Sequence, residues 1–147
     1  MPYPYPDGEA ERWIGTHADK YEQGDFSFAI TLKENGALIG AIGLHSVSVH
    51  EKAEMGYWLG KEYWGKGYAS EAAKCMVKFG FEQLHLHRIF AHYFMHNPAS
   101  RRVMEKAGLK FEGVLRGEVV KDGRHIDLGV CGMTLEDYRE ERLVPMD

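Results

Sequence analysis

The sequence has no long apolar run, and among its 147 residues it has only two cysteines and five prolines. No apolar stretch approaches the roughly 20 residues that a membrane-spanning helix needs. The first residues, rich in tyrosine and proline, have neither the basic start nor the apolar segment of a signal peptide. Cys75 and Cys131 show no disulfide or zinc spacing and fit a reducing compartment. We therefore expect a cytoplasmic protein that makes no contact with a membrane.

An excess of basic residues is also missing. The chain has 18 Lys and Arg against 22 Asp and Glu, which gives a formal net charge of -4. A nucleic-acid binder holds the phosphate backbone mainly with clustered Lys and Arg, so we expect no nucleic-acid partner. The negative charge is compatible with a cationic substrate such as an amine, although many acidic proteins bind nothing cationic.

The eight histidines form no recognisable metal-binding pattern. His85 and His87 could share one face of the chain, but no third ligand stands at a spacing typical of a metal site. We therefore expect a protein that binds no metal ion.

Hydrophobic periodicity and turn residues predict a single domain over residues 1–147. Strands are expected at 26–33, 37–47, 52–59, 88–95, 109–120 and 125–135, and helices at about 9–22, 67–84 and 97–108. The strand at 88–95 is apolar on both faces apart from His92, as in a strand that is covered on both sides. The predicted fold class is α/β (α+β), a mixed sheet with helices, with the strand–loop–helix–strand unit at 52–95 at its centre.

A glycine-bearing loop joins the third expected strand to the following helix. Gly65 and Gly67 allow backbone N–H groups to converge on a phosphate at the helix N-terminus, and Lys66 adds a positive charge. A glycine turn that merely joins strand to helix has about equal weight on this spacing alone. The sequence lacks the nucleotide P-loop pattern, and a dinucleotide fingerprint is weak because Ser70 replaces its third glycine.

The loop Trp64-Gly65-Lys66-Gly67-Tyr68-Ala69 resembles the acetyl-CoA loop of the GNAT superfamily of N-acetyltransferases. The family pattern is Arg or Gln, two residues, Gly, one residue, and Gly or Ala. Trp64 replaces the leading residue, whereas Gly67 and Ala69 keep the later positions. The run at 63–72 is particularly similar to the branch that acetylates the N-termini of ribosomal proteins, as are Asn97-Pro98-Ala99-Ser100, Gly108 and Glu112-Gly113.

This resemblance implies a GNAT-like mixed, mostly antiparallel central sheet flanked by helices. Family members usually carry a further strand and helix before the segment that resembles Pro4-Tyr5-Pro6, and this chain begins there. We therefore expect the usual first strand and helix to be lacking from these residues, either because the sequence starts late or because the protein is a shortened version. Their loss would leave a sheet edge uncovered and part of the acceptor site unformed.

The resemblance also implies acetyl-CoA as the cosubstrate. Asn97 would hold a pantetheine amide and Ser100 would lie near the sulfur, although both residues also suit helix capping. Gly56 is expected to mark a bulge that opens a slot beside its strand. The residues expected to bind acetyl-CoA are Tyr57, Trp58, Leu59, Trp64, Gly65, Lys66, Gly67, Tyr68, Ala69, Asn97 and Ser100.

An ammonium group must lose a proton before its nitrogen can attack a thioester, so the site needs a base or a water relay. Glu54, on the strand that leads into the loop, is similar in place to the glutamate that acts as base in histone-acetylating family members. Glu118 resembles a glutamate of the ribosomal-protein branch that handles the proton of the amine. Both also suit ordinary strand positions, and the sequence does not choose between them.

The departing thiolate needs an acid. Many family members use a tyrosine a few residues after the asparagine, but Met104 stands there and cannot donate a proton. Ser100 is the substitute that the ribosomal-protein branch implies. The candidate catalytic residues are therefore Glu54, Glu118 and Ser100.

The expected function is the transfer of an acetyl group from acetyl-CoA to a primary amine, with a protein N-terminal α-amine as the leading acceptor. A polyamine or an aminoglycoside-like molecule is the alternative acceptor. A non-catalytic module that binds acyl-CoA is the alternative from another class of protein. The resemblance leaves a homodimer open.

Overall fold

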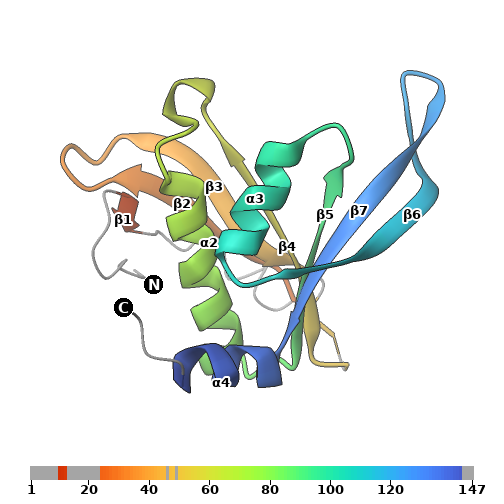
Figure 1. The fold of residues 1–147 in the computed structure, drawn as a ribbon. Coiled ribbons are helices and arrows are strands. Elements are labelled where there is room, and N and C mark those ends of the chain that lie inside the picture. Colours follow the sequence, from red (N-terminus) through yellow and green to blue (C-terminus); the bar gives the residue numbers. More distant parts are fainter. Residues whose placement is uncertain (1–9, 13–23, 46, 49, 144–147) are drawn as a thin grey trace.

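The computed structural model describes residues 10–12, 24–45, 47–48 and 50–143 of the chain. These residues form one seven-stranded sheet with helices packed against it (Figure 1). Across the sheet the strand order is β1-β2-β3-β4-β5-β7-β6, in which β4 and β5 run parallel and every other neighbouring pair is antiparallel. The expected mixed, mostly antiparallel sheet is confirmed. The strands are β1 (Ala10–Arg12), β2 (Phe26–Leu32), β3 (Leu38–His45), β4 (Lys52–Leu59), β5 (Arg88–Phe94), β6 (Lys110–Lys121) and β7 (Arg124–Thr134).

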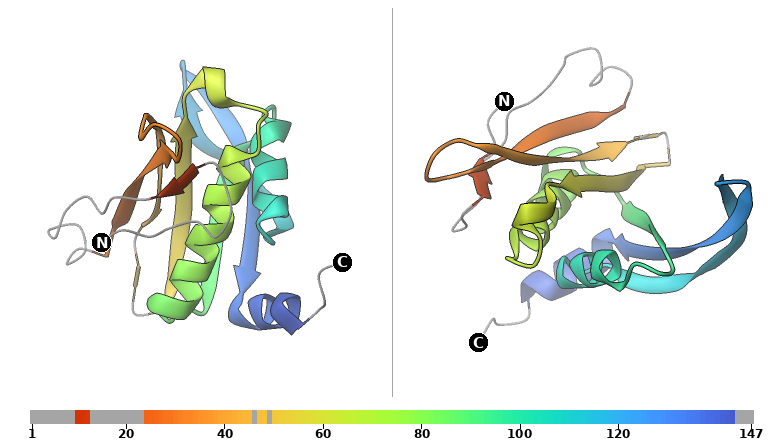
Figure 2. Two further views of the ribbon diagram at one scale, coloured as in Figure 1. Left: turned by 90° about the vertical axis from the view of Figure 1, so that its left-hand side faces the viewer. Right: turned by 90° about the horizontal axis from the view of Figure 1, so that it is seen from above.

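Two helices, α2 and α3, pack against the sheet. α2 contacts β3 and β4, α3 contacts β5, β6 and β7, and the two helices contact each other. Figure 2 shows them side by side on one face of the sheet. No helix in the described part of the chain is long and apolar enough to span a bilayer. The helical segments are η1 (Lys61–Tyr63), α2 (Tyr68–Lys78), the π-helical turn η2 (Phe79–Gln83), α3 (Pro98–Lys106) and α4 (Leu135–Leu143).

The apolar face of α2 forms much of the core. Ala72 and Ala73 are fully buried and Met76 is 1% exposed, as the three-to-four-residue spacing of its apolar positions predicts. The helix continues into η2, where a Cβ on Gly80 would lie 2.7 Å from Cδ1 of Ile89. Small residues therefore let this helix approach the sheet closely.

Most of the expected boundaries agree with the structure within two residues. A turn at Asn35 and Gly36 joins β2 to β3, where Gly36 has a φ of +71° and Oδ1 of Asn35 accepts a hydrogen bond from the Ala37 N–H. The helix expected at 9–22 lies almost wholly outside the described residues. Where it can be compared it was wrong, because Ala10–Arg12 pair with the edge of β2 as a strand.

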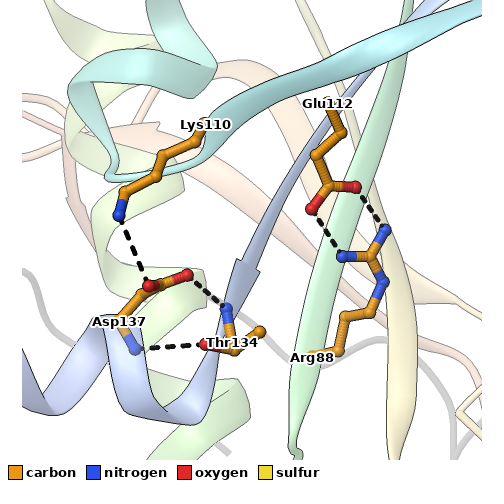
Figure 3. Close-up of polar contacts among 5 residues, drawn as sticks. All are labelled: Arg88, Lys110, Glu112, Thr134 and Asp137. Carbon is orange, nitrogen blue, oxygen red and sulfur yellow. Dashed lines mark hydrogen bonds and ion pairs between the residues drawn. The ribbon is translucent and has the colours of Figure 1, made fainter.

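The sequence analysis did not predict α4. At its start the Thr134 N–H donates to Oδ2 of Asp137 at 3.0 Å, and the Asp137 N–H donates to Oγ1 of Thr134 at 3.2 Å. This reciprocal cap begins the helix. Lys110 of β6 lies 3.4 Å from the same carboxylate (Figure 3). The signal was present in the sequence as Thr, two residues and Asp directly after the last strand.

Arg88 of β5 and Glu112 of β6 form a bidentate ion pair that passes over β7 (Figure 3). Their two hydrogen bonds measure 2.8 and 2.7 Å. A Cβ on Gly132 of β7 would overlap both the carboxylate and the guanidinium. The glycine therefore makes room for the pair, and the pair ties the β6–β7 hairpin to β5.

Candidate functional site

β4 and β5 are paired only briefly and then separate. Beyond the paired residues, β4 stays in register with β3 as far as Leu59, and β5 stays in register with β7 as far as Phe94. Figure 1 shows the two strands diverging. The sheet therefore opens between β4 and β5, while β4 stays paired with β3 and β5 stays paired with β7. The paired positions are Lys52 with Arg88, Ala53 with Ile89, and Glu54 with Phe90.

The expected bulge at Gly56 was wrong. Gly56 lies opposite Gly43 of β3 in an unbroken antiparallel register. The opening lies instead where the β4–β5 pairing ends, while β4 stays paired with β3 and β5 with β7.

A cavity of about 420 Å³ lies at this opening, between the end of β4, the loop after it, the N-terminal end of α2 and one side of α3. Lys66 is exposed and does not line it, and neither do Glu54 and Glu118. The structure thus brings together residues that are far apart in the sequence. The expected cosubstrate-binding residues that line the cavity are Tyr57, Trp58, Leu59, Trp64, Gly65, Gly67, Tyr68, Ala69, Asn97 and Ser100.

The glycine loop leads directly into the N-terminus of α2. Gly65 and Gly67 have φ values of +76° and +86°, and a Cβ on either would meet no atom within 4 Å. The first backbone hydrogen bond of the helix runs from the Glu71 N–H to the Gly67 carbonyl at 3.0 Å. The preceding N–H groups have no acceptor within the helix, so they form a site with partial positive charge.

Trp64, which replaces the polar first residue of the family pattern, ties the loop to the strand. Its indole Nε1–H donates to the carbonyl oxygen of Leu59 at 2.7 Å. The ring is still 60% exposed. The side chain thus closes the turn after β4 and presents an apolar surface at the cavity.

Two basic side chains that were not among the predicted site residues line the cavity. Arg102 and Lys106 stand four residues apart on α3 and both contribute to its wall. Arg101 is held elsewhere, because it pairs with Glu105 and stacks on the Phe111 ring. The four-residue spacing of basic residues after the Asn97 cap was the available signal.

Tyr57 of β4 and Ser100 of α3 both line the cavity. Burial raises the pKa of the Tyr57 phenol above 10.0, and the influence of Ser100 lowers it by less. Asn97 caps α3, since its Oδ1 accepts a hydrogen bond from the Ser100 N–H at 3.3 Å. Met104 is 2% exposed.

Glu54 is paired with a residue that the sequence analysis did not assign to the site. Oε2 of Glu54 lies 2.7 Å from Nδ1 of His92 on β5. A carboxylate only accepts, so the imidazole N–H is the donor. Phe90 packs edge-to-face on the His92 ring, with centroids 5.6 Å apart. After Arg88 at its start, β5 is aliphatic or aromatic apart from the imidazole of His92, and that exception was the signal.

Glu118 lies elsewhere. It is exposed on β6, in the hairpin that extends from the body of the molecule (Figure 1). The β6–β7 register shifts between Leu115 and Val119, and the Gly117 N–H donates to Oδ1 of Asp127 at 2.8 Å. Of the two candidate bases, the structure therefore places Glu54 at the opening and Glu118 on the projecting hairpin.

The remaining polar candidates do not gather into a site. Among the described residues, no three His, Cys, Asp or Glu side chains are grouped as a metal ion would require. Cys75 and Cys131 are buried thiols, and burial raises the pKa of Cys131.

The chain is similar to acetyltransferases over most of its length. A family model described as an acetyltransferase (GNAT) domain matches residues 1–110. The uncharacterized N-acetyltransferase YoaA of Bacillus subtilis is 38% identical over 124 residues, which cover 83% of this chain and 70% of YoaA. The putative ribosomal N-acetyltransferase YdaF of the same organism is 35% identical over 109 residues, which cover 74% of this chain and 60% of YdaF.

Solved structures show the same likeness. The F149A mutant of the spermidine N-acetyltransferase SpeG from Vibrio cholerae matches with a TM-score of 0.76 at 25% identity. The match covers 83% of this chain and 72% of the mutant SpeG chain. The chain thus spans 60 to 70% of the length of the curated relatives YdaF and YoaA.

Proposed function

The chain belongs to the GNAT acetyltransferase family, and on this premise we propose that it transfers the acetyl group of acetyl-CoA to a primary amine. The observation that carries the proposal is the cavity at the opening between β4 and β5, with a glycine loop and a helix N-terminus in its wall. The leading acceptor is the N-terminal α-amine of a protein.

The cavity residues fit the anionic end of acetyl-CoA. Gly65 and Gly67 leave open space where side chains would stand, so a phosphate can reach the backbone N–H groups of α2. Arg102 and Lys106 add two positive charges, and none of the described residues that line the cavity is acidic. This charge balance supports a ligand that carries phosphate groups.

The edge of β4 fits the pantetheine arm. Beyond Glu54 the strand has no β5 partner, so backbone groups at Tyr57 and Trp58 can pair with the pantetheine amides as an added strand would. The cap on α3 uses only Oδ1 of Asn97. The Nδ2 donor of the same side chain is left for a pantetheine carbonyl.

The Glu54–His92 pair supports Glu54 as the group that accepts the proton of the amine, directly or through one water. The imidazole holds one carboxylate oxygen and leaves the other for the acceptor. Glu54 stands at the last paired position of the two strands, next to the place where the thioester would lie. Glu118 is the second candidate base, and it would act only if the β6–β7 hairpin lines the acceptor path.

Two acceptors are supported by relatives. YdaF is named a putative ribosomal N-acetyltransferase and is 35% identical, which favours a protein N-terminus. SpeG is a spermidine N-acetyltransferase at 25% identity, which supports a polyamine as the second candidate. The higher identity of YdaF supports the α-amine as the leading acceptor of this proposal.

The test joins ligand binding to turnover. Acetyl-CoA and CoA should raise the melting temperature, because a ligand that binds the native state stabilises it, while NAD and ATP should do much less. Thiol release should then be followed with acetyl-CoA and a panel of N-terminal peptides, polyamines and aminoglycosides. Equal stabilisation by NAD would reject the proposal. Binding of acetyl-CoA without turnover of any amine would identify a non-catalytic acyl-CoA module instead.

A further inference from the structure

The outer face of the sheet, the one away from α2 and α3, carries a row of side chains along β5. The buried residues Ile89, Ala91 and Tyr93 point toward the helices. Because side chains alternate along a strand, the residues between them point to the outer face. These partly exposed residues are Arg88, Phe90, His92 and Phe94. An acceptor that approaches Glu54 from the outer face meets this row.

Two cations lie over aromatic rings of the row, and they differ in their partners. The guanidinium carbon of Arg88 lies 5.3 Å from the centre of the Phe90 ring, and its charge is balanced by the ion pair with Glu112. Nζ of Lys121 lies 4.8 Å from the centre of the Phe94 ring. Within the described part of the chain no carboxylate forms an ion pair with Lys121. Its ammonium is therefore a positive charge that a ligand can neutralise.

The shape of the β6–β7 hairpin brings Lys121 to the outer face. Lys121 is the last residue of β6, and the register with β7 shifts between Leu115 and Val119. Such a shift bends a strand and increases its twist. Figure 2 shows the tip of the hairpin on the side of the sheet away from the two helices. The hairpin thus borders the approach to Glu54, which is also the condition for a role of Glu118.

Glu54 and Lys121 lie at the two ends of a short path over the outer face. Glu54 is hydrogen-bonded to His92, and Phe94, under the Lys121 ammonium, is two residues further along β5. With a rise of about 3.3 Å per residue, the carboxylate and the ammonium are roughly 10 Å apart. An extended peptide rises at the same rate, so its α-amine can lie at Glu54 while a side chain of its second or third residue reaches Lys121.

The two ends of this path favour opposite charges. The Glu54 carboxylate attracts the amine, whereas the Lys121 ammonium attracts an anion. A polyamine carries a second ammonium group, which Lys121 would repel. A peptide with a carboxylate near its N-terminus matches both ends, and the apolar rings of Phe90 and Phe94 can pack against its other side chains.

We propose that Lys121 and Phe94 form an acceptor subsite that binds a carboxylate in the second or third residue of an N-terminal peptide. This inference rests on the proposed acetyl transfer and names its acceptor class, an acidic N-terminus. The Phe94 ring holds the ammonium in place by a cation–π contact, and the ammonium pairs with the carboxylate. No bond is made or broken at this subsite.

Peptide binding in the presence of CoA tests the subsite without turnover, because CoA has no acetyl group to transfer. Calorimetry compares peptides that differ only by Glu or Gln at the second, third or seventh residue. At the second or third residue, Glu should bind about threefold to fivefold tighter than Gln, as an exposed ion pair would give. The preference should shrink at high salt. At the seventh residue there should be none.

Variants of the subsite assign the preference to its residues. Lys121→Met keeps most of the apolar stem and should bind the Glu and Gln peptides equally. Lys33→Met is the matched control, because Lys33 is an exposed lysine in the β2–β3 turn, and it should keep the wild-type preference. Phe94→Leu leaves the net charge unchanged but removes the ring, so the preference should become smaller. Lys121→Glu should prefer the Gln peptides.

Thiol release with the same peptides and with spermidine completes the test. The wild type should turn over the Glu peptides with the highest kcat/KM, and Lys121→Glu should shift the ratio toward spermidine. If Lys121→Met keeps the wild-type preference, or if the wild type binds Glu and Gln peptides equally, the inference is wrong. Faster turnover of spermidine than of every peptide also rejects it. These results leave the acetyl transfer intact, whereas failure to bind CoA, or no thiol release with any amine, rejects the proposed function and this inference together.

Discussion

Glu54 and His92 are hydrogen-bonded at 2.7 Å across the two parallel strands, at the point where those strands begin to separate. The side chain of His92 is 24% exposed and that of Glu54 is 41% exposed. The pair is therefore accessible from the side of the sheet that the helices do not cover. An acceptor amine can approach one carboxylate oxygen while the imidazole holds the other.

The first prediction concerns this pair. Glu54→Gln keeps the shape of the side chain but removes the basic oxygen, so kcat should fall about a hundredfold to ten-thousandfold with acetyl-CoA affinity nearly unchanged. Steady-state kinetics with a fixed peptide acceptor, together with calorimetry, measure both quantities. Glu118→Gln is the parallel variant. A large loss in Glu118→Gln and none in Glu54→Gln would move the base to the β6–β7 hairpin.

His92 should act on the rate through Glu54. His92→Phe removes the N–H donor and should lower kcat about tenfold to a hundredfold, because a misplaced reacting group lowers the rate by such factors. His92→Asn keeps a donor near the position of Nδ1 and should recover most of the loss. If His92→Phe and His92→Asn are equally slow, the ring supports packing with Phe90 rather than the position of Glu54.

The cosubstrate loop gives the second prediction. In Gly67→Val a side chain would stand in the open space between the α2 amides and the pyrophosphate, so acetyl-CoA affinity should fall far more than stability. Gly36→Val is the matched control. Gly36 also has a positive φ and open space around it, but it lies in the β2–β3 turn. Calorimetry and thermal unfolding of both variants separate backbone strain from lost binding; unchanged affinity in Gly67→Val would show that the loop is only a connector.

The two cations on α3 give the third prediction. Arg102→Ala and Lys106→Ala should each weaken the binding of CoA, and the difference from wild type should shrink as salt rises, because the attraction is screened. Arg101→Ala is the control, since Arg101 is held by Glu105 and Phe111 on the same helix. Titration of CoA at low and high salt is the measurement. Equal effects of all three variants would mean that only the net charge of α3 matters.

The strands and the glycine loop could be predicted because they depend on local signals. Apolar residues alternate along β4 in the sequence, and Gly65 and Gly67 predict a loop whose backbone a phosphate could approach. The opening of the sheet could not be predicted in the same way. It follows from the register of β4 with β3 and of β5 with β7, which is a property of the assembled sheet. The expected bulge at Gly56 was a local explanation for that non-local effect, and it failed for this reason.

The site pairs show the same limit. Glu54 and His92, which are hydrogen-bonded, lie more than thirty positions apart in the sequence, and so do Tyr57 and Ser100, which line one cavity. No spacing pattern relates the members of either pair. The sequence could name Glu54 and Ser100 through the family resemblance. It could not name their partners, because which side chains meet depends on strand order and on the place of α3.

Acid should weaken the fold through two carboxylates, which is the fourth prediction. The Arg88 hydrogen bonds lower the pKa of Glu112 below 4.5, and the bond from the Thr134 backbone, with smaller help from Lys110, lowers that of Asp137 below 3.8. Both groups bind protons more weakly when folded, so their stabilisation is present above these unfolded values and is lost as the pH falls through the folded values. Urea unfolding at neutral pH and at about pH 3 measures the loss.

Glu112→Gln isolates the first carboxylate. Gln does not titrate, so the variant should be less stable than wild type at neutral pH and should lose less stability on acidification. Glu136→Gln, at an exposed position on α4, is the control. Both side chains of the Arg88–Glu112 pair are about a third exposed, so the effect is screened and should stay within about 1 kcal/mol. A pH dependence equal to that of the wild type would show that the ion pair adds nothing to stability.

The last prediction tests the packing of β5 against β7. Gly129 lies directly opposite Tyr93, and a Cβ on Gly129 would overlap the Tyr93 ring, which is 4% exposed and cannot swing into solvent. Gly129→Ala should therefore lower the free energy of unfolding by about 1 to 3 kcal/mol, as overpacking of a core does. Gly56→Ala is the matched control in β4, because its nearest neighbour, the His45 ring, would be 3.8 Å from the new Cβ. That variant should unfold at nearly the wild-type urea concentration. If the clash with the ring is the cause, adding Tyr93→Val to Gly129→Ala should destabilise by less than the sum of the two single changes. Additive losses would mean that the alanine disturbs the backbone of β7 and not its contact with Tyr93.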